Sequence, residues 1–435
     1  MSRKFHSRLL QSIIKSIYAR NSVTAFIVTA YATVAGFSVQ WLAARVLSPF
    51  EFGTYSIGMS LIGIGSIFCL SGSDTTILLY TTRYSTKCSA HPNKVLLKTL
   101  IKWFAATSLL SITCIFAVSI TSLNIRLLDA TFIGLCTFLI PATILLQSRL
   151  RGSNRMVLSF LPEGAIRPTI VLTGLAISFG TGVSLSAADV FFVIVLGSVV
   201  AFCCAANWVN NTPPVSKIKD RTYNLKMEKQ AWLKNNATFL FISAGNALNT
   251  QIGVLIFGWM RLTVDAGIFG IVIRLSTLTI FITSVINIVF STKFVELHTE
   301  RKYRELRKVT LYAATFSFLS ALPISLVFLI FPSEVMSIFG SHFISGSFAL
   351  QVSAAGYLIH SAIGPVLSSL ALSGQQKSIA KIQYIAMAIN AITTSTLAYQ
   401  IGIDSAAYGI LVNQVFSACA VTLLIYRSRS APEHD

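Results

Sequence analysis

The chain has 435 residues, of which 54% are hydrophobic and only 11% are charged, and its mean hydropathy is +0.71. Because a soluble domain carries about a quarter charged residues, this composition excludes an ordinary water-soluble enzyme. The formal net charge is +19, but the basic residues are spread over seven separate segments. That spread argues against nucleic-acid binding, which needs one groove-sized basic patch.

Apolar runs of about 20 residues, the length that crosses about 30 Å of hydrocarbon, recur along the whole chain. They lack the alternation of a β-barrel, so we expect an all-α integral membrane protein. The basic start of the chain leads into a full-length first span without a small-residue cleavage site, so we expect this span to stay as an anchor. The predicted spans are 22–46, 52–72, 103–123, 127–147, 157–179, 187–208, 239–260, 267–290, 309–331, 347–370, 379–399 and 406–426.

The Lys and Arg residues are distributed unevenly between the two sides of this predicted bundle. Of the 34, 29 fall in alternate segments on one side. Arg45, Arg126 and Arg261 fall on the other side, and Arg167 and Arg274 lie inside spans. The positive-inside rule therefore places the N and C termini in the cytoplasm.

Two pairs of similar segments indicate an internal repeat. In PFEFGTYSIGMSL and TVDAGIFGIVIRLS an acid, Glu51 or Asp265, stands two residues before a glycine. LRGSNR at 150–155 matches LSGQQK at 372–377, and the offsets are 214 and 222 residues. Parallel repeats of this kind are typical of transporters. We therefore predict a six-helix lobe at 1–208, a cytoplasmic interlobe linker at 209–238 and a second six-helix lobe at 239–435.

Charged residues inside spans cost about 2.5 to 3.5 kcal/mol each at a helix centre, so each needs a partner, a cavity or a function. Glu163 and Arg167 are four residues apart and share a helix face, between two prolines that favour an irregular helix. They form either a structural ion pair or part of a binding site. In the second case Arg45, Arg167 and Arg274 line a cationic cavity, because guanidinium groups match phosphate oxygens. For Arg45 the alternative is a side chain that reaches the headgroups.

Uncharged polar residues inside spans are further candidates. Asn246 and Asn249 share a face of the seventh span, and they either bind sugar hydroxyls or hydrogen-bond neighbouring helices. Asp74 closes the second span, and His360 lies in the middle of the tenth. Both are candidates for coupling to an ion, although a lone histidine in a bundle is more often a structural residue.

Motifs for soluble chemistry are absent from the sequence. There is no phosphate-binding glycine loop ending in Lys-Ser or Lys-Thr, no HExxH pair and no nucleophile elbow. The seven cysteines have no metal-like spacing. We therefore expect no enzymatic activity, no catalytic residue, no cofactor and no metal.

Three segments carry a resemblance to a known family. ARVLSPFEFGTYSIGMSL at 44–61, RLRGSNRMVLSFLPEGAIRP at 149–168 and YLIHSAIGPVLSSLALSGQQ at 357–376 resemble the polysaccharide-transporter family of the MOP superfamily, the O-antigen and exopolysaccharide flippases of bacterial inner membranes. The family often uses cationic residues in its cavity, and the resemblance implies that Arg167 and Arg274 could supply them. The seventh span departs from the pattern, because many relatives carry an Asp where this chain has Asn249 and Gln251.

This resemblance implies a MATE-like fold of two six-helix lobes, shared with multidrug exporters and lipid II flippases. It also implies a substrate, an oligosaccharide repeat unit on undecaprenyl pyrophosphate, and a multi-pass location in the bacterial inner membrane. The partners implied are this lipid-linked glycan, membrane lipids, a polysaccharide polymerase and a chain-length regulator.

Two other functions compete with this one. A multidrug exporter of the same superfamily needs an acidic cavity for cationic drugs, whereas the charges inside the spans of this chain lean towards arginine. A membrane polysaccharide polymerase needs a sizeable outer loop for its catalytic residues. The longest predicted outer loop, 332–346, has only about 15 residues.

Overall fold

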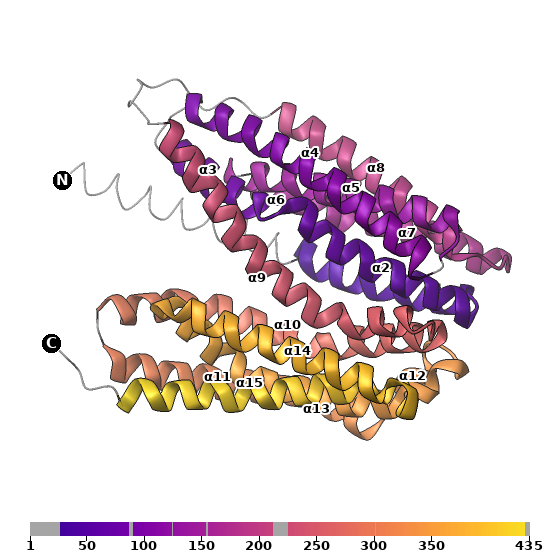
Figure 1. The fold of residues 1–435 in the computed structure, drawn as a ribbon. Coiled ribbons are helices and arrows are strands. Elements are labelled where there is room, and N and C mark those ends of the chain that lie inside the picture. The colour runs from indigo at the N-terminus through magenta and orange to yellow at the C-terminus, as the bar shows by residue number, and fades with distance from the viewer. Residues whose placement is uncertain are drawn as a thin grey trace, which may run out of the picture. The chain divides into compact units, whose positions relative to one another are not determined.

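The computed structural model of the chain describes residues 27–86, 90–123, 125–153, 155–211, 225–300 and 302–430. These ranges contain helices and no β-strand (Figure 1). The first helix runs over Ile27–Val46. The following elements are α2 (Pro49–Leu70), α3 (Ser73–Thr86), α4 (Ala90–Thr121), α5 (Leu127–Gly152), α6 (Met156–Leu161), η1 (Pro162–Ile166), α7 (Arg167–Thr181), α8 (Ala187–Asn210), α9 (Leu225–Trp259), α10 (Thr263–Thr299), α11 (Tyr303–Ile330), α12 (Pro332–Ser337), η2 (Ser341–Gly346), α13 (Ser347–Leu370), η3 (Ala371–Gln375), α14 (Gln376–Ile401) and α15 (Asp404–Ser430).

The described part of each of the twelve predicted spans is largely helical, residues 22–26 of the first span lying outside the described residues. This confirms an all-α integral membrane protein. Within the described residues, ten helices are long and apolar enough to cross a membrane, and α9 makes an eleventh if its two bent parts count as one span. Helix α14 covers the prediction at 379–399 and is not among them. Polar residues such as Gln383 and Asn390 lower its hydropathy. The total of twelve spans and the side of the termini stay predictions.

The break between α2 and α3 depends on a glycine. Ser71 and Gly72 both have positive φ, 46° and 75°. A Cβ at Gly72 would lie 2.5 Å from the carbonyl oxygen of Asn236 and 2.8 Å from Cβ of Phe239, both in α9. Only glycine allows both this backbone conformation and so close an approach. The chain can therefore turn from α2 into α3 at the point where α9 packs against it.

The irregular helix predicted around Pro162 and Pro168 is confirmed. Residues Pro162–Ile166 form a π-helical turn, η1, that joins α6 to α7 within one spanning segment, Met156–Thr181. Proline has no backbone N–H to donate, so it favours such a local change in helical register. Single π-turns inside α-helices are frequent at functional sites.

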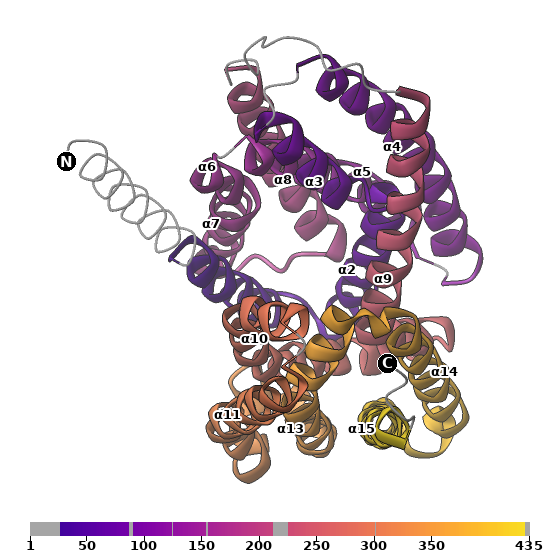
Figure 2. The same ribbon diagram turned by 90° about the vertical axis from the view of Figure 1, so that its left-hand side faces the viewer.

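The chain divides into two compact units. Unit 1 takes in the residues up to Ser48 and Leu61–Ala244, and unit 2 takes in Pro49–Ser60 and the residues from Gly245 onward. Helices α2 and α9 therefore each contribute one part to each unit. Figure 2 views several helices of unit 2, among them α10, α11, α13 and α15, nearly along their axes.

Unit 1 contains an apolar core that α9 completes. The core residues come from α2 to α5, and fully buried Trp232 of α9 packs among them. Helix α9 begins at Leu225, inside the segment predicted as a linker. A search for apolar runs misses this part of α9, because within residues 227–236 only one face, with Trp232 and Asn236, is buried. The other core residues are Cys69, Leu70, Ile77, Tyr80, Tyr84, Leu96, Leu100, Phe104, Ala142 and Leu145.

Polar contacts join α9 to α3 beside this core. The Tyr84 hydroxyl donates to Oε2 of Glu228 at 2.9 Å, and Nδ2 of Asn236 donates to the Ser73 hydroxyl at 3.1 Å. Burial raises the pKa of the Tyr84 phenol, and its hydrogen bond to the Glu228 carboxylate raises it further. The amphipathic start of α9 is thus part of unit 1.

In unit 2 the first half of α2 crosses α10 at glycines. Cα of Gly53 would lie 2.9 Å from a Cβ placed on Gly267, and a Cβ on Gly53 would overlap the carbonyl oxygen of Thr263. One turn further on, a Cβ on Gly270 would lie 2.8 Å from Oγ of Ser56. Gly53 and Gly267, and likewise Ser56 and Gly270, are separated by the 214-residue offset of the repeat. Equivalent residues of the two repeats therefore meet at this crossing.

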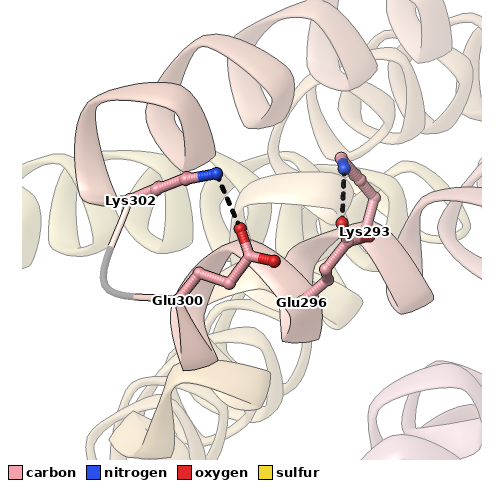
Figure 3. A network of polar contacts seen from close by, with 4 residues as sticks. All are labelled: Lys293, Glu296, Glu300 and Lys302. Atoms are coloured by element: carbon pink, nitrogen blue, oxygen red, sulfur yellow. Dashed lines mark hydrogen bonds and ion pairs between the residues drawn. The ribbon is translucent and has the colours of Figure 1, made fainter.

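Charged side chains lie where α10 ends and α11 begins. Lys293 donates to Oε1 of Glu296 at 2.9 Å, and Lys302 forms an ion pair with Glu300, also at 2.9 Å (Figure 3). The bond from Lys302 lowers the pKa of the Glu300 carboxyl. These pairs are exposed, so they add little stability. They lie at the end of unit 2 that the distribution of Lys and Arg predicts to face the cytoplasm.

Candidate functional site

The predicted Glu163–Arg167 ion pair is present. Nη1 of Arg167 lies 2.6 Å from Oε2 of Glu163, and 24% and 16% of the two side chains are exposed. Two glycines let neighbouring helices come close to the pair. A Cβ on Gly197 of α8 would lie 3.3 Å from Cγ of Arg167, and one on Gly164 would lie 3.1 Å from Cγ1 of Val28 in the first helix. The π-turn and these contacts fix the pair inside unit 1.

The pair keeps unused capacity for hydrogen bonds. Oε1 of Glu163 is buried and has no hydrogen-bond partner among the described residues. A guanidinium group has five N–H donors, so one contact with Glu163 does not exhaust its ability to bind an anion. The arrangement is chemically able to hold an anionic group on Arg167 beside Glu163.

The other two charged candidates in unit 1 lie near helix ends. Arg45 is exposed in the last turn of the first helix. Asp74 is half-buried in the first turn of α3, accepts a hydrogen bond from the Thr75 hydroxyl at 3.3 Å, and lies within electrostatic range of Arg151. A carboxylate in the first turn also stabilises its own helix through the helix dipole. A coupling role for Asp74 stays a prediction.

Three hydrogen-bonded pairs of polar side chains lie inside unit 2 and are together called the amide cluster. Nδ2 of Asn413 donates to Oδ1 of Asn249 at 2.6 Å, and His360 Nδ1 lies 3.0 Å from Oε1 of Gln414. Gln414 offers a carbonyl oxygen, so the ring nitrogen is the donor in this bond. The members of the amide cluster are Asn249, His360, Asn390, Thr394, Asn413 and Gln414.

Helix α14 completes the amide cluster. The Thr394 hydroxyl donates to Oδ1 of Asn390 at 3.2 Å, and both side chains are almost fully buried. They face Gly409 of α15, where a Cβ would overlap the Asn390 oxygen. Sequence reasoning found Asn249 and His360 but missed the members on α14 and α15. The adjacent amides Asn413 and Gln414 within an apolar span were the available signal.

The remaining candidates of unit 2 are less fully placed. Arg274 is exposed on α10, well inside a spanning helix. Asn246 lies in α9, and its side chain is outside the described residues. Arg45 and Arg167 belong to unit 1, whereas Arg274 belongs to unit 2. The convergence of these three arginines on one cavity therefore stays a prediction.

Most acidic residues of the described helices lie in first turns, where the helix dipole favours a negative charge. Asp189 also forms a capping box with Ser186. Apart from these, Glu296 and Glu300 end α10, and within the described spans Glu163 alone lies away from such an end. The first-turn acids are Glu51, Asp74, Asp129, Asp189, Glu228, Asp265, Glu305, Glu334 and Asp404. Among the described residues, no three His, Cys, Asp or Glu side chains are grouped to hold a metal ion.

Comparison with known proteins shows the fold. No protein-family model and no curated protein matches the sequence. An inward-facing multidrug-resistance MATE transporter of the MOP superfamily superposes with a TM-score of 0.69 and 12% identity, over 94% of this chain and 99% of that one. The lipid II flippase MurJ, in an inward closed conformation, gives 0.63 and 15% over 94% and 88%. The MATE multidrug transporter DinF-BH, in a ligand complex, gives 0.64 and 12% over 94% and 95%.

The chain therefore has the fold of MOP superfamily transporters. With its many apolar helices, it is a multi-pass membrane protein. Its structural neighbours are transporters and a flippase rather than enzymes.

Proposed function

We propose that this chain is a flippase that moves undecaprenyl-pyrophosphate-linked oligosaccharide repeat units from the cytoplasmic to the periplasmic leaflet by alternating access. It would serve the synthesis of O-antigen or another surface polysaccharide in a bacterial inner membrane. The fold supports this proposal because it is shared by a lipid II flippase, a protein whose named substrate is a lipid.

The observation that carries the proposal is the chemistry of the charges inside the described spans. Arg167 and Arg274 lie well inside spanning segments, whereas the single interior carboxylate, Glu163, is already bound to Arg167. The other acids of these spans stabilise helix starts. This distribution favours an anionic substrate group such as a pyrophosphate, which guanidinium groups bind well.

The membrane potential supplies a drive for this transport. Moving one charge through 100 mV is worth about 2.3 kcal/mol, so exporting a pyrophosphate with about two charges from a negative cytoplasm gains roughly 4 to 5 kcal/mol. Flipping in reconstituted vesicles should therefore speed up when an inside-negative potential is imposed on inward-oriented substrate. A rate independent of the potential would contradict this drive and favour ion antiport.

The decisive experiment follows the lipid-linked repeat units in cells. Deletion of the protein should abolish surface polysaccharide and cause cytoplasm-facing glycolipid to accumulate, and wild type should reverse both effects. Arg274→Ala at matched expression should fail to rescue. Arg304→Ala is the matched control, because Arg304 is exposed in the first turn of α11, at the end of its candidate span. An unchanged glycolipid pool in the deletion strain would overturn the proposal.

The second candidate is a multidrug exporter, because MATE transporters share the fold of this chain. It predicts that cells lacking the protein become sensitive to cationic dyes and that Glu163→Gln abolishes dye export. Unaltered dye sensitivity together with glycolipid accumulation would exclude it.

A further inference from the structure

The contact between Glu163 and Arg167 is a single-point ion pair. It joins one guanidinium nitrogen to one carboxylate oxygen at 2.6 Å, and Oε1 of Glu163 has no hydrogen-bond partner among the described residues. The pair therefore lacks the two parallel hydrogen bonds of a bidentate arginine–carboxylate pair, the strong form of this contact. A pair held at one point opens more readily than a bidentate pair.

Both partners of the pair come from one irregular segment of the chain. Glu163 belongs to the π-turn η1, and Arg167 is the first residue of α7. Because the two residues are four positions apart, the pair forms without a side chain from another helix. Parts of both side chains remain exposed, so the pair is not sealed within the packing of unit 1.

The other arginine well inside a span lacks such a partner. Arg274 is exposed, and no carboxylate in the described part of the chain forms an ion pair with it. A neighbouring carboxylate is therefore not a general requirement for an arginine in these spans. The presence of Glu163 beside Arg167 needs a reason that applies to Arg167 alone.

Few other titratable groups surround the pair. Cys136 of α5 is fully buried and lies within electrostatic range of both partners, and α6 has no titratable residue. The acids of α5 and α8 lie in first turns, about two helical turns from Cys136 and from Gly197, which face the pair. Thiols and phenols are neutral below about pH 8. The other titratable or charged residues of the described first helix, α5 and α8 are Tyr31, Arg45, Asp129, Arg149, Arg151, Asp189, Cys203 and Cys204.

We propose that Glu163 limits the affinity of Arg167 for an anionic phosphate group, so that Arg167 releases the substrate after binding it. While the pair is closed its net charge is zero, and an anion meets only the remaining N–H donors. An anion that displaces Glu163 leaves a desolvated carboxylate without its partner, and this cost weakens binding. The inference rests on the proposed flippase function and makes Glu163 a competitor of the substrate rather than a contact to it.

Transport gives such a competitor a purpose. A transport site must bind its substrate strongly enough to load it and weakly enough to let it leave. A guanidinium group inside a span attracts a phosphate more strongly than in water, because Coulomb attraction grows as the dielectric constant falls. If the pair is closed for about nine-tenths of the time, the apparent affinity falls about tenfold, because it scales with the fraction of open sites.

The test compares affinity with turnover in the full-length chain, reconstituted in phosphatidylethanolamine vesicles. The probe is undecaprenyl pyrophosphate that carries one sugar. Glu163→Gln should bind this lipid about tenfold more tightly than wild type and flip it more slowly at saturation, because release becomes limiting. Glu334→Gln is the matched control, because Glu334 is exposed in the first turn of α12. Unchanged affinity, or weaker affinity together with slower flipping as a structural pair predicts, would overturn the proposal.

The wild-type chain provides a second measurement that does not require Glu163→Gln to fold. The affinity for the same lipid should rise as the pH falls from about 8 to about 5, because a protonated Glu163 carries no charge and no longer holds Arg167. The charge of the probe stays constant, because a pyrophosphate diester lacks the second phosphate proton, whose pKa is about 6 in monoesters. Glu334→Gln should keep this pH dependence. A wild-type affinity that is constant or falls at low pH would overturn the proposal.

The two proposals fail in different ways. If wild type flips the glycolipid but Glu163→Gln binds it no more tightly, the inference about Glu163 is wrong and the flippase proposal stands. If wild type neither binds nor flips the glycolipid, both are wrong. Tighter binding with slower flipping in Glu163→Gln, and neither change in Glu334→Gln, supports the competing role of Glu163.

Discussion

The Glu163–Arg167 pair gives the sharpest test of the structure. Both side chains are mostly removed from solvent, and their charged atoms are 2.6 Å apart. Removing one partner of a buried pair leaves the other charge without compensation and typically costs about 3 to 5 kcal/mol. Because 24% and 16% of the two side chains remain exposed, we expect Arg167→Ala to cost about 3 kcal/mol, the lower end of that range.

A double variant separates the energy of the ion pair from the effects of the two single substitutions. Replacing a buried ion pair by apolar or neutral residues of similar volume is often nearly neutral. Glu163→Gln with Arg167→Met should therefore unfold within about 1 kcal/mol of wild type. If the single variants Glu163→Gln and Arg167→Met each cost about 3 kcal/mol, the cycle should give a coupling energy of about 5 kcal/mol. The assay is reversible unfolding in mixed micelles, followed by the fluorescence of the tryptophans.

The same variants decide between a structural and a functional pair. A stable double variant that no longer rescues the glycolipid phenotype would show that Arg167 acts on the substrate. A stable double variant with full rescue would assign the pair to structure alone. Single variants as stable as wild type would refute the reasoning, because they would mean that the pair is fully solvated.

Three further changes test other contacts. Gly53→Ala should cost about 1 to 3 kcal/mol, because its Cβ overlaps α10. Gly36→Ala meets open space and should be neutral or stabilising by up to about 1 kcal/mol in the same unfolding assay. Because the pKa of Tyr84 is raised in the folded chain, the unfolded chain loses this phenol proton first as the pH rises. The contribution of Tyr84 to stability is therefore full below about pH 10 and decreases at higher pH. Tyr84→Phe should therefore flatten the alkaline fall in melting temperature, whereas exposed Tyr399→Phe should not. Asn413→Ala should cost about 1 kcal/mol by removing the hydrogen bond from buried Asn413 to half-buried Asn249, and a cost near zero would show that water replaces the bond.

Sequence reasoning predicted the parts of the fold that depend on local chemistry. The apolar runs gave the positions of the helices, and the prolines on either side of Glu163 and Arg167 gave the irregular turn that the structure shows. The predicted repeat pairs Gly53 with Gly267, and these two glycines meet where α2 crosses α10. Each of these features is encoded within a few neighbouring residues.

What sequence reasoning missed depends on contacts between distant residues. Asn249 and Asn413 are 164 positions apart, so neither residue predicts the hydrogen bond between them. The helix at the start of α9 escapes a search for apolar runs, because it is stabilised by the burial of Trp232 against other helices. Tertiary packing of one face overrides local polarity in such a segment.

The two predicted repeats differ in the chemistry of their interiors. At the 222-residue offset, Glu163 and Arg167 correspond to Ile385 and Ile389, so the second repeat has no counterpart of the ion pair. Unit 2 instead has three neutral hydrogen-bonded pairs, Asn249 with Asn413, Asn390 with Thr394 and His360 with Gln414. A lipid-linked oligosaccharide has an anionic pyrophosphate and an uncharged sugar part, and these need charged and amide groups respectively. An exporter of simple cations needs neither an arginine inside a span nor a buried set of amides. The division of polar chemistry between the repeats therefore favours the glycolipid substrate.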